Sequence, residues 1–184
     1  MRGIKVSYGS FHGPMMVESV VGAIFYFLKS FHLSKKMQLQ KKWARIEISD
    51  KLGSLKGSRV TILGFDKIGQ CIGEFLKPYG CTIVGIKRIP AERPNYFTEN
   101  DRILSIDKIS DVLKTTDHLI LALPGGLETE GLVTLELLNK LPASCYIYNV
   151  GRGNVYQEQD LVEVLQKRKV AGAYLDVFAV EPLP

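Results

Sequence analysis

The chain has 184 residues, of which 46% are hydrophobic, and its formal net charge is +5. This length suits one globular domain with a sizeable core and excludes a second domain of full size. The positive charge does not indicate a nucleic-acid partner, because the lysines and arginines are scattered and no nucleic-acid motif accompanies them. Their densest group has the spacing of a solvated helix face: Lys35, Lys36, Lys41 and Lys42.

The cysteines and the longest apolar stretch indicate the cellular compartment and argue against a membrane span. Cys71, Cys81 and Cys145 are isolated, so we expect small core residues in a reducing compartment and neither disulfides nor a metal site. The apolar stretch 17–28 is shorter than the ~20 residues of a membrane span. We therefore expect no membrane contact, an amphipathic helix at 17–28 and a cytoplasmic protein. An organelle-targeting leader stays open if the chain is truncated at its N-terminus.

The expected elements begin with a strand-like start at 4–7, which two helical segments at 15–30 and 34–43 follow. A polar loop is expected at 47–58. Beyond it strands alternate with helices. The strands are expected at 60–63, 82–86, 118–123, 146–150 and 172–175, and the helices at 67–77, 107–114, 135–141 and 157–167. This alternation, with strands apolar on both sides, predicts a Rossmann-like α/β fold: a doubly wound parallel sheet with helices on both faces.

Unusual residues follow the expected strands. Ligands of open α/β sheets bind outside the carboxyl ends of the strands, so we expect these segments to meet at one edge of the sheet. They are 64–69, 87–88, 123–126, 149–153 and 176–182.

The first of these segments is a nucleotide fingerprint, G-x-G-x-x-G, with an aspartate in place of its second glycine. Gly64 is expected to make the turn after the strand, and Gly69 to let helix and strand pack closely. Asp66 places a carboxylate where a pyrophosphate would approach, at a cost of roughly 1 kcal/mol in water and about 4 kcal/mol at an effective dielectric near 20. We expect Asp66 to cap the helix that starts at Lys67, Lys67 to neutralise part of its charge, and dinucleotide binding to be weak.

Together these segments resemble the nucleotide-binding domain of the D-isomer-specific 2-hydroxyacid dehydrogenase family over almost the whole chain. The matching motifs are L-K-G at 55–57, the glycine-rich segment 64–80, L-P at 123–124, E-T-E-G-L at 128–132, N-V-G-R-G at 149–153 and A-G-A-Y-L-D-V-F-A-V-E-P at 171–182. The resemblance implies an NAD(P)-dependent oxidoreductase that transfers a hydride between nicotinamide and the 2-carbon of a 2-hydroxy or 2-keto acid.

The resemblance also assigns residues to roles. Arg152 would bind the carboxylate and keto oxygen of the substrate, for which a planar guanidinium is suited. Glu181 would orient a catalytic histidine and raise its pKa. Without the resemblance, Arg152 could also pair with a surface carboxylate, and Glu181 would be read as an exposed acid before a proline. The expected cofactor-binding residues are Gly64, Asp66, Lys67, Ile68, Gly69, Lys87, Arg88, Leu123, Pro124, Val150, Gly151 and Asp176, of which Asp176 would contact the nicotinamide carboxamide.

Lys87 and Arg88 stand where the family has an acidic residue that binds the adenosine ribose. Two cations suit a 2′-phosphate, so NADP is favoured over NAD as the cofactor. The alternative is that both cations merely solvate a loop.

Two parts of the resembled enzymes are not expected within the chain. Their catalytic histidine lies beyond the D-V-F-x-x-E-P segment, and we assign that role to none of His12, His32 and His118. The substrate-binding domain is also expected to be absent, so that 1–184 is a single dinucleotide-binding domain with interdomain and dimer helices at 1–45 and a Rossmann core at 58–182. A non-catalytic nucleotide-sensing or scaffold protein, or an inactive fragment, stays open as an alternative.

A homodimer is expected through the first long helix. Its apolar residues wrap around more than one helical face, which one small sheet can hardly cover. They are Val17, Val20, Val21, Ile24, Phe25, Phe27 and Leu28.

Overall fold

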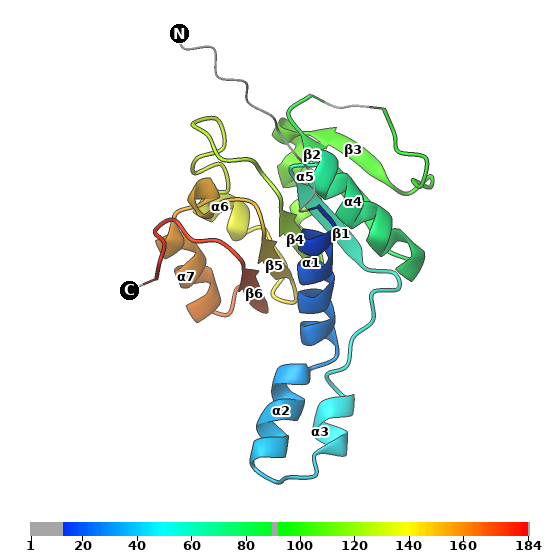
Figure 1. Cartoon of the computed structure of the whole chain (residues 1–184), viewed down its shortest axis with the longest axis vertical. Coiled ribbons are helices and arrows are strands. Elements are labelled where there is room, and N and C mark those ends of the chain that lie inside the picture. The colour runs from blue at the N-terminus through cyan, green and yellow to red at the C-terminus, as the bar shows by residue number, and fades with distance from the viewer. Residues whose placement is uncertain (1–12, 90–91, 184) are drawn as a thin grey trace.

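Six parallel strands form the centre of the molecule (Figure 1), in a computed structural model that describes residues 13–89 and 92–183. The strand-like start expected at 4–7 lies outside these residues. The strands are β1 Arg59–Leu63, β2 Thr82–Lys87, β3 Arg102–Ser105, β4 His118–Leu121, β5 Tyr146–Asn149 and β6 Gly172–Leu175. Their order is β3-β2-β1-β4-β5-β6, which is the order of doubly wound dinucleotide-binding folds. The predicted fold class is confirmed.

Helices cover both faces of this sheet. They are α1 Gly13–Leu28, α2 Phe31–Leu39, α3 Arg45–Ser49, α4 Lys67–Leu76, α5 Ile109–Leu113, α6 Leu135–Leu138 and α7 Glu158–Gln166, with 3-10 turns at Lys77–Tyr79, Ile106–Lys108 and Gly153–Val155. Because side chains alternate along a strand, Val60 and Ile62 enter a core with α1 and α4, whereas Leu63 enters a second core with α5, α6 and α7. The strands β1, β2 and β4 are therefore held between two packed helical layers, which fixes the position of their carboxyl ends.

Two elements were not predicted. The edge strand β3 was missed, because it has four residues, none of them fully buried, and follows a polar segment. The helix α3 lies partly in the segment expected to be a loop, and it has five residues without a side-chain cap. The other helices and strands are where the sequence predicts them, with bounds that differ by a few residues.

Asp101 fixes the start of β3. Its buried carboxylate accepts hydrogen bonds from the Ile83 N–H at 2.8 Å and the Thr98 N–H at 2.6 Å, and it pairs with the Lys77 ammonium at 2.6 Å. Burial alone would raise the pKa of Asp101, but the hydrogen bonds from Ile83, Lys77 and Thr98 hold it below its usual value. This one side chain ties together α4, β2 and the segment before β3.

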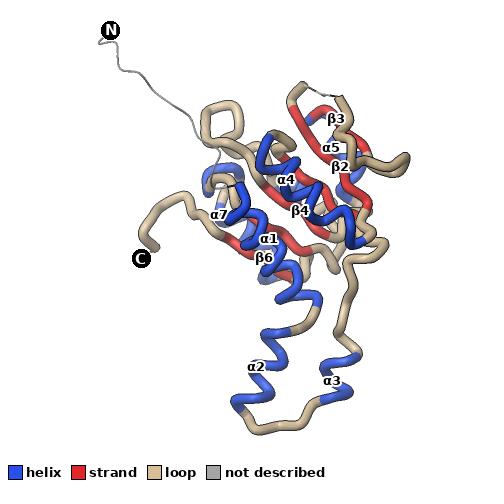
Figure 2. The backbone as a smooth tube through the Cα atoms, turned by 45° about the vertical axis from the view of Figure 1, so that its right-hand side comes forward, coloured by secondary structure: helices blue, strands red, loops and turns tan. Residues whose placement is uncertain are grey.

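The helices α2 and α3 form an arm outside the sheet layers (Figures 1 and 2). At its base the Lys29 ammonium donates to the Gly53 carbonyl at 2.8 Å, and the Ser30 hydroxyl donates to the Lys51 carbonyl at 3.1 Å. The arm carries several exposed apolar side chains: Phe31, Leu39, Trp43, Ile46 and Leu52.

The helix α1 packs on its own sheet. Val17, Val20, Val21 and Ile24 are buried in the core shared with α4, so one chain covers much of the apolar surface that the sequence assigned to a dimer contact. The division of the chain at residue 45 and the dimer itself stay predictions.

No single helix among the described residues is long and apolar enough to cross a membrane. Only α1 and α2 taken together reach the required length and hydropathy, and they are bent by 61° where they meet. All three cysteines are free. Cys81 and Cys145 are buried as expected, but Cys71 is exposed, because it lies on the outward face of α4 beside the buried Ile72.

Candidate functional site

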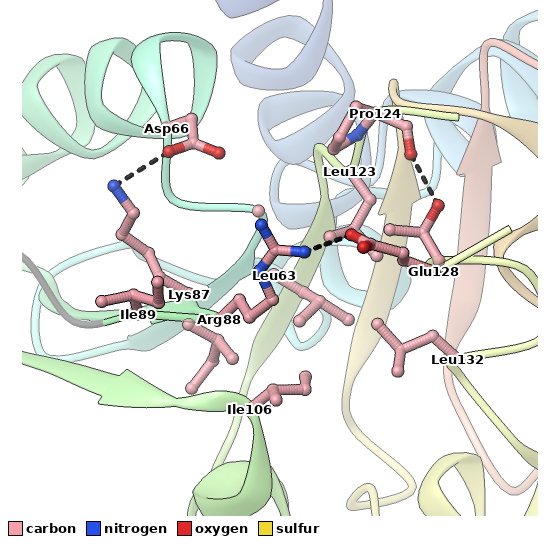
Figure 3. Close-up of a pocket in the computed structure, with 13 residues that line it drawn as sticks. Leu63, Asp66, Lys87, Arg88, Ile89, Ile106, Leu123, Pro124, Glu128 and Leu132 are labelled. Atoms are coloured by element: carbon pink, nitrogen blue, oxygen red, sulfur yellow. Dashed lines mark hydrogen bonds and ion pairs between the residues drawn. The ribbon is translucent and has the colours of Figure 1, made fainter. Parts of the chain in front are cut away.

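A cavity of about 380 Å³ opens at the carboxyl ends of β1, β2 and β4 (Figure 3). Leu63, Ile86, Ile106 and Leu132 give it apolar walls, and charged side chains lie at its rim. Its full lining is Leu63, Gly64, Asp66, Ile86, Lys87, Arg88, Ile89, Ile106, Leu123, Pro124, Glu128, Thr129 and Leu132. An apolar slot with a few polar groups, at the point where the strand order reverses, is the usual form of a nucleotide site in this fold.

The two retained glycines of the fingerprint shape the turn from β1 into α4. Gly64 has a φ of +94°, and a Cβ there would lie 2.6 Å from the carbonyl carbon and oxygen of Ala122. A Cβ on Gly69 would lie 2.4 Å from the Gly64 carbonyl oxygen. These contacts account for the turn and the close helix packing that the sequence predicts.

Asp66 behaves differently from the prediction. It is the N-cap residue of α4, but its side chain makes no capping hydrogen bond. Its carboxylate instead pairs with the Lys87 ammonium at 2.9 Å, across from β1 to the end of β2. The expected capping bond is wrong because Lys87 provides a charged partner at the end of the next strand. Lys67 forms no ion pair within the described part of the chain, so Lys87 is the residue that neutralises Asp66.

A second ion pair lies at the rim of the cavity. Arg88 Nη1 donates to Glu128 Oε2, which joins the end of β2 to the loop after β4. Thr129 fixes that loop, since its hydroxyl donates to the Pro124 carbonyl at 2.8 Å. The E-T-E-G-L segment is one of the motifs that match the family, but Glu128, Thr129 and Leu132 were not predicted as site residues. Their position after a predicted strand end was the available signal.

Half of the predicted cofactor residues line this cavity: Gly64, Asp66, Lys87, Arg88, Leu123 and Pro124. The remaining ones lie outside it. Lys67, Ile68 and Gly69 form the first turn of α4, Val150 and Gly151 follow β5, and Asp176 follows β6. The geometry therefore brings together one half of the predicted site, and the roles of the other residues stay predictions.

Asn149 holds the loop that carries Arg152. This fully buried side chain donates from Nδ2 to the Arg152 carbonyl at 2.9 Å, and its Oδ1 accepts from the Gly151 N–H at 3.0 Å. The Arg152 side chain is exposed and donates to the Gly151 carbonyl at 2.8 Å. Among the residues described, it pairs with no carboxylate, so its guanidinium remains open to an anionic ligand. Its stem passes Gly125, where a Cβ would lie 3.1 Å from Arg152 Cγ.

The segment that carries Asp176 and Glu181 packs against the same loop. A Cβ on Gly153 would lie 1.9 Å from the Phe178 carbonyl carbon, so the glycine after Arg152 is required for this packing. Glu181 Oε1 accepts from the Phe178 N–H at 2.9 Å. Both acids are exposed.

His118 lies at the other end of the sheet. It is the first residue of β4, is almost fully buried, and has Nδ1 3.0 Å from the Tyr148 hydroxyl. Burial lowers the pKa of His118 to about 4. Because the ring is buried at the amino end of a strand, its position agrees with the choice not to assign His118 a catalytic role. His32 is exposed on α2, and His12 lies outside the described residues.

Comparisons with known proteins agree with this geometry. Residues 21–184 match the family model described as D-isomer specific 2-hydroxyacid dehydrogenase, NAD binding domain. A curated relative, glyoxylate/hydroxypyruvate reductase A of Photorhabdus laumondii, is 30% identical over 172 residues, which are 94% of this chain and 52% of the relative.

Solved structures of the same family superpose on the chain. A D-isomer specific 2-hydroxyacid dehydrogenase family protein from Aeromonas salmonicida has a TM-score of 0.85 and 33% identity, over 97% of this chain and 55% of that one. A D-isomer specific 2-hydroxyacid dehydrogenase from Xanthobacter autotrophicus, solved with NADPH and MES, has a TM-score of 0.84 and 25% identity, over 99% of this chain and 73% of that one. The chain spans about half the length of the curated relatives it matches.

Proposed function

Because the chain belongs to the NAD-binding domain family of the D-isomer-specific 2-hydroxyacid dehydrogenases, we propose that it is the cofactor-binding half of such an enzyme. The observation that carries this proposal is the apolar cavity beside the Gly64 turn, at the carboxyl ends of β1, β2 and β4. The nicotinamide cofactor, when bound, supplies or accepts the hydride. The substrate would be a small 2-keto or 2-hydroxy acid, such as the glyoxylate and hydroxypyruvate in the names of the relatives.

The residues of this chain would bind and orient the reactants. Arg152 offers paired donors to a carboxylate and polarises the adjacent keto oxygen, so that C2 accepts a hydride more readily. Its position is held by Asn149, whose side chain accepts from the Gly151 N–H and donates to the Arg152 carbonyl. Glu181 would accept a hydrogen bond from the histidine that protonates the oxygen and would raise the pKa of that histidine.

The cofactor preference proposed here is NADP over NAD. Lys87 and Arg88 lie at the end of β2 and line the cavity, and a 2′-phosphate offers oxygens that match a guanidinium. The NADPH named for the Xanthobacter autotrophicus protein points in the same direction. A cytoplasmic location and a homodimer are further parts of the proposal, and the exposed apolar side chains of the α2–α3 arm support the homodimer.

Titration calorimetry of the full chain with NADPH and NADH tests the proposal. We expect both to bind, with NADPH the tighter, and Arg88→Gln to remove the difference between them. Tighter binding of NADH would overturn the preference, and no binding of either would overturn the function.

A non-catalytic nucleotide-sensing or scaffold role is the second candidate. Asp66 favours this candidate. It stands in place of the second glycine of the fingerprint, and its carboxylate lies where the phosphates would approach. Oxidation of NADPH with glyoxylate or hydroxypyruvate, by the chain joined to both the substrate-binding domain and the histidine-bearing C-terminal segment of a relative, distinguishes the two. Cofactor binding without turnover, in a fusion shown to be folded, would favour the second candidate.

A further inference from the structure

Two acidic side chains form ion pairs with the two cationic side chains that line the cavity (Figure 3). Asp66 pairs with Lys87 and Glu128 pairs with Arg88, and all four side chains line the same space. An incoming phosphate therefore meets cations that already have carboxylate partners.

The two pairs differ in burial. The Lys87 side chain is only 18% exposed, and it leans toward Asp66 at the β1–α4 turn. The Arg88 and Glu128 side chains are 70% and 76% exposed, and an exposed ion pair of this kind contributes little to stability. The Arg88–Glu128 pair is therefore the one that a ligand exchanges at small cost.

Carboxylate and phosphate compete for the same donors of Arg88. A guanidinium presents a planar set of N–H groups that fits either anion, so Glu128 cannot keep its bond while a phosphate takes the same face. A nucleotide without a 2′-phosphate makes no such demand on Arg88.

Resting on the proposed function, we infer that Glu128 is a specificity-determining residue that competes with the 2′-phosphate for Arg88. It reduces the affinity for 2′-phosphorylated nucleotides and leaves the affinity for their unphosphorylated counterparts unchanged. Two residues thus set the preference for NADP over NAD: Arg88, which directly follows β2, and Glu128 in the loop after β4.

The loop does not depend on this ion pair for its shape. The Thr129 hydroxyl bonds the Pro124 and Gly126 carbonyls, and the Gly131 N–H bonds the Asn154 carbonyl at 2.9 Å. Glu128→Gln therefore removes the charge without removing the contacts that hold the backbone. Glu130→Gln is a matched control, because Glu130 is an exposed acid of the same loop that does not line the cavity.

The test is calorimetric titration of the full chain and its variants with adenosine 2′,5′-bisphosphate and with adenosine 5′-monophosphate. We expect Glu128→Gln to tighten binding of the bisphosphate about fivefold, as removal of one charge near 4 Å in water-like surroundings predicts, and to leave the monophosphate unchanged. The gain should shrink in high salt and vanish in the Arg88→Gln background.

Several results would overturn the inference. An equal gain for both nucleotides, or the same gain from Glu130→Gln, would indicate a general field effect. Unchanged or weaker bisphosphate binding, with thermal unfolding as in the unmodified chain, would show that Glu128 does not compete or that it positions Arg88. If neither nucleotide binds any variant, the proposed function fails as well, whereas binding without the bisphosphate effect removes the role of Glu128 alone.

Discussion

Asp66 places a carboxylate at the turn between β1 and α4, and this carboxylate points to Lys87 instead of capping the helix. The first N–H groups of α4 therefore keep their hydrogen-bonding capacity for an anion, although the nearby charge opposes one. Arg152 shows the complementary case, a cation with no carboxylate partner among the described residues.

We predict that Asp66→Gly raises the affinity for NADPH by about 1 kcal/mol or more, because the substitution removes a negative charge from the phosphate approach. The gain should fall as salt screens the repulsion. Because the side chain makes no capping bond and the Asp66 carboxylate is 70% exposed, the free energy of unfolding should drop by only a few tenths of a kcal/mol.

Asp66→Asn is the matched control in the calorimetric titration, since it removes the charge and keeps the Cβ. If charge is the cause, both variants gain affinity. A gain in the glycine variant alone would identify the Cβ as the obstacle, and unchanged affinity in both would favour the scaffold role.

Elements with strong periodicity could be predicted from the sequence, and elements fixed by distant contacts could not. β1 and β4 are short segments in the middle of the sheet that are rich in Val, Ile and Leu, so their residues alone indicate buried strands. β3 depends on Asp101, which bonds Ile83 and Lys77 from 18 and 24 positions away. Glu128 was missed as a site residue for the same reason, because its partner Arg88 is 40 positions away.

We predict that Asp101→Ala lowers the free energy of unfolding by about 3 kcal/mol, because it removes the acceptor of the buried Ile83 N–H and the carboxylate that pairs with the part-buried Lys77 ammonium. Urea unfolding followed by circular dichroism measures this loss. Asp111→Ala serves as the control, since Asp111 is an exposed acid on α5 and its removal should change stability by less than about 0.5 kcal/mol. Equal losses in the two variants would contradict the role of Asp101 as an anchor.

The whole molecule consists of a sheet with its two helical layers and an arm that leaves them (Figure 2). The layers bury the apolar face of α1 that carries Val17, Val20 and Ile24, whereas the arm exposes apolar side chains that the described residues do not cover. We interpret these exposed apolar side chains as an association surface, which sedimentation velocity tests.

We predict that the chain is a dimer at tens of micromolar and that Trp43→Glu shifts it toward the monomer. Trp43 is 88% exposed, between α2 and α3, and a charge there opposes burial in an interface. Sedimentation velocity measures the mass. Gln38→Glu adds the same charge at an exposed polar position of the arm and should leave the dimer intact. A monomeric mass for the unmodified chain would count against association through this arm.

The pH dependence of global stability follows from the buried His118. Its ring faces Tyr146 and Tyr148, and Asp117 precedes it, yet burial outweighs the neighbouring carboxylate and lowers its pKa from 6.5 to about 4. The folded state binds a proton at His118 less readily than the unfolded chain does. The stability that the neutral ring contributes is therefore complete above pH 6.5 and is lost as the pH falls from 6.5 to 4. Its size reaches ~3 kcal/mol over that range.

We therefore predict that urea unfolding of the unmodified chain shows a decline in stability between pH 6.5 and 4 that His118→Gln largely removes. His32→Gln should keep the decline, because His32 is exposed on the arm, outside the sheet layers that bury His118. If His118→Gln does not fold, the ring resonances of His118 in the unmodified chain give the same information by NMR, since they should titrate near pH 4. Titration near pH 6.5 would show that the ring is reached by water and that the decline has another source.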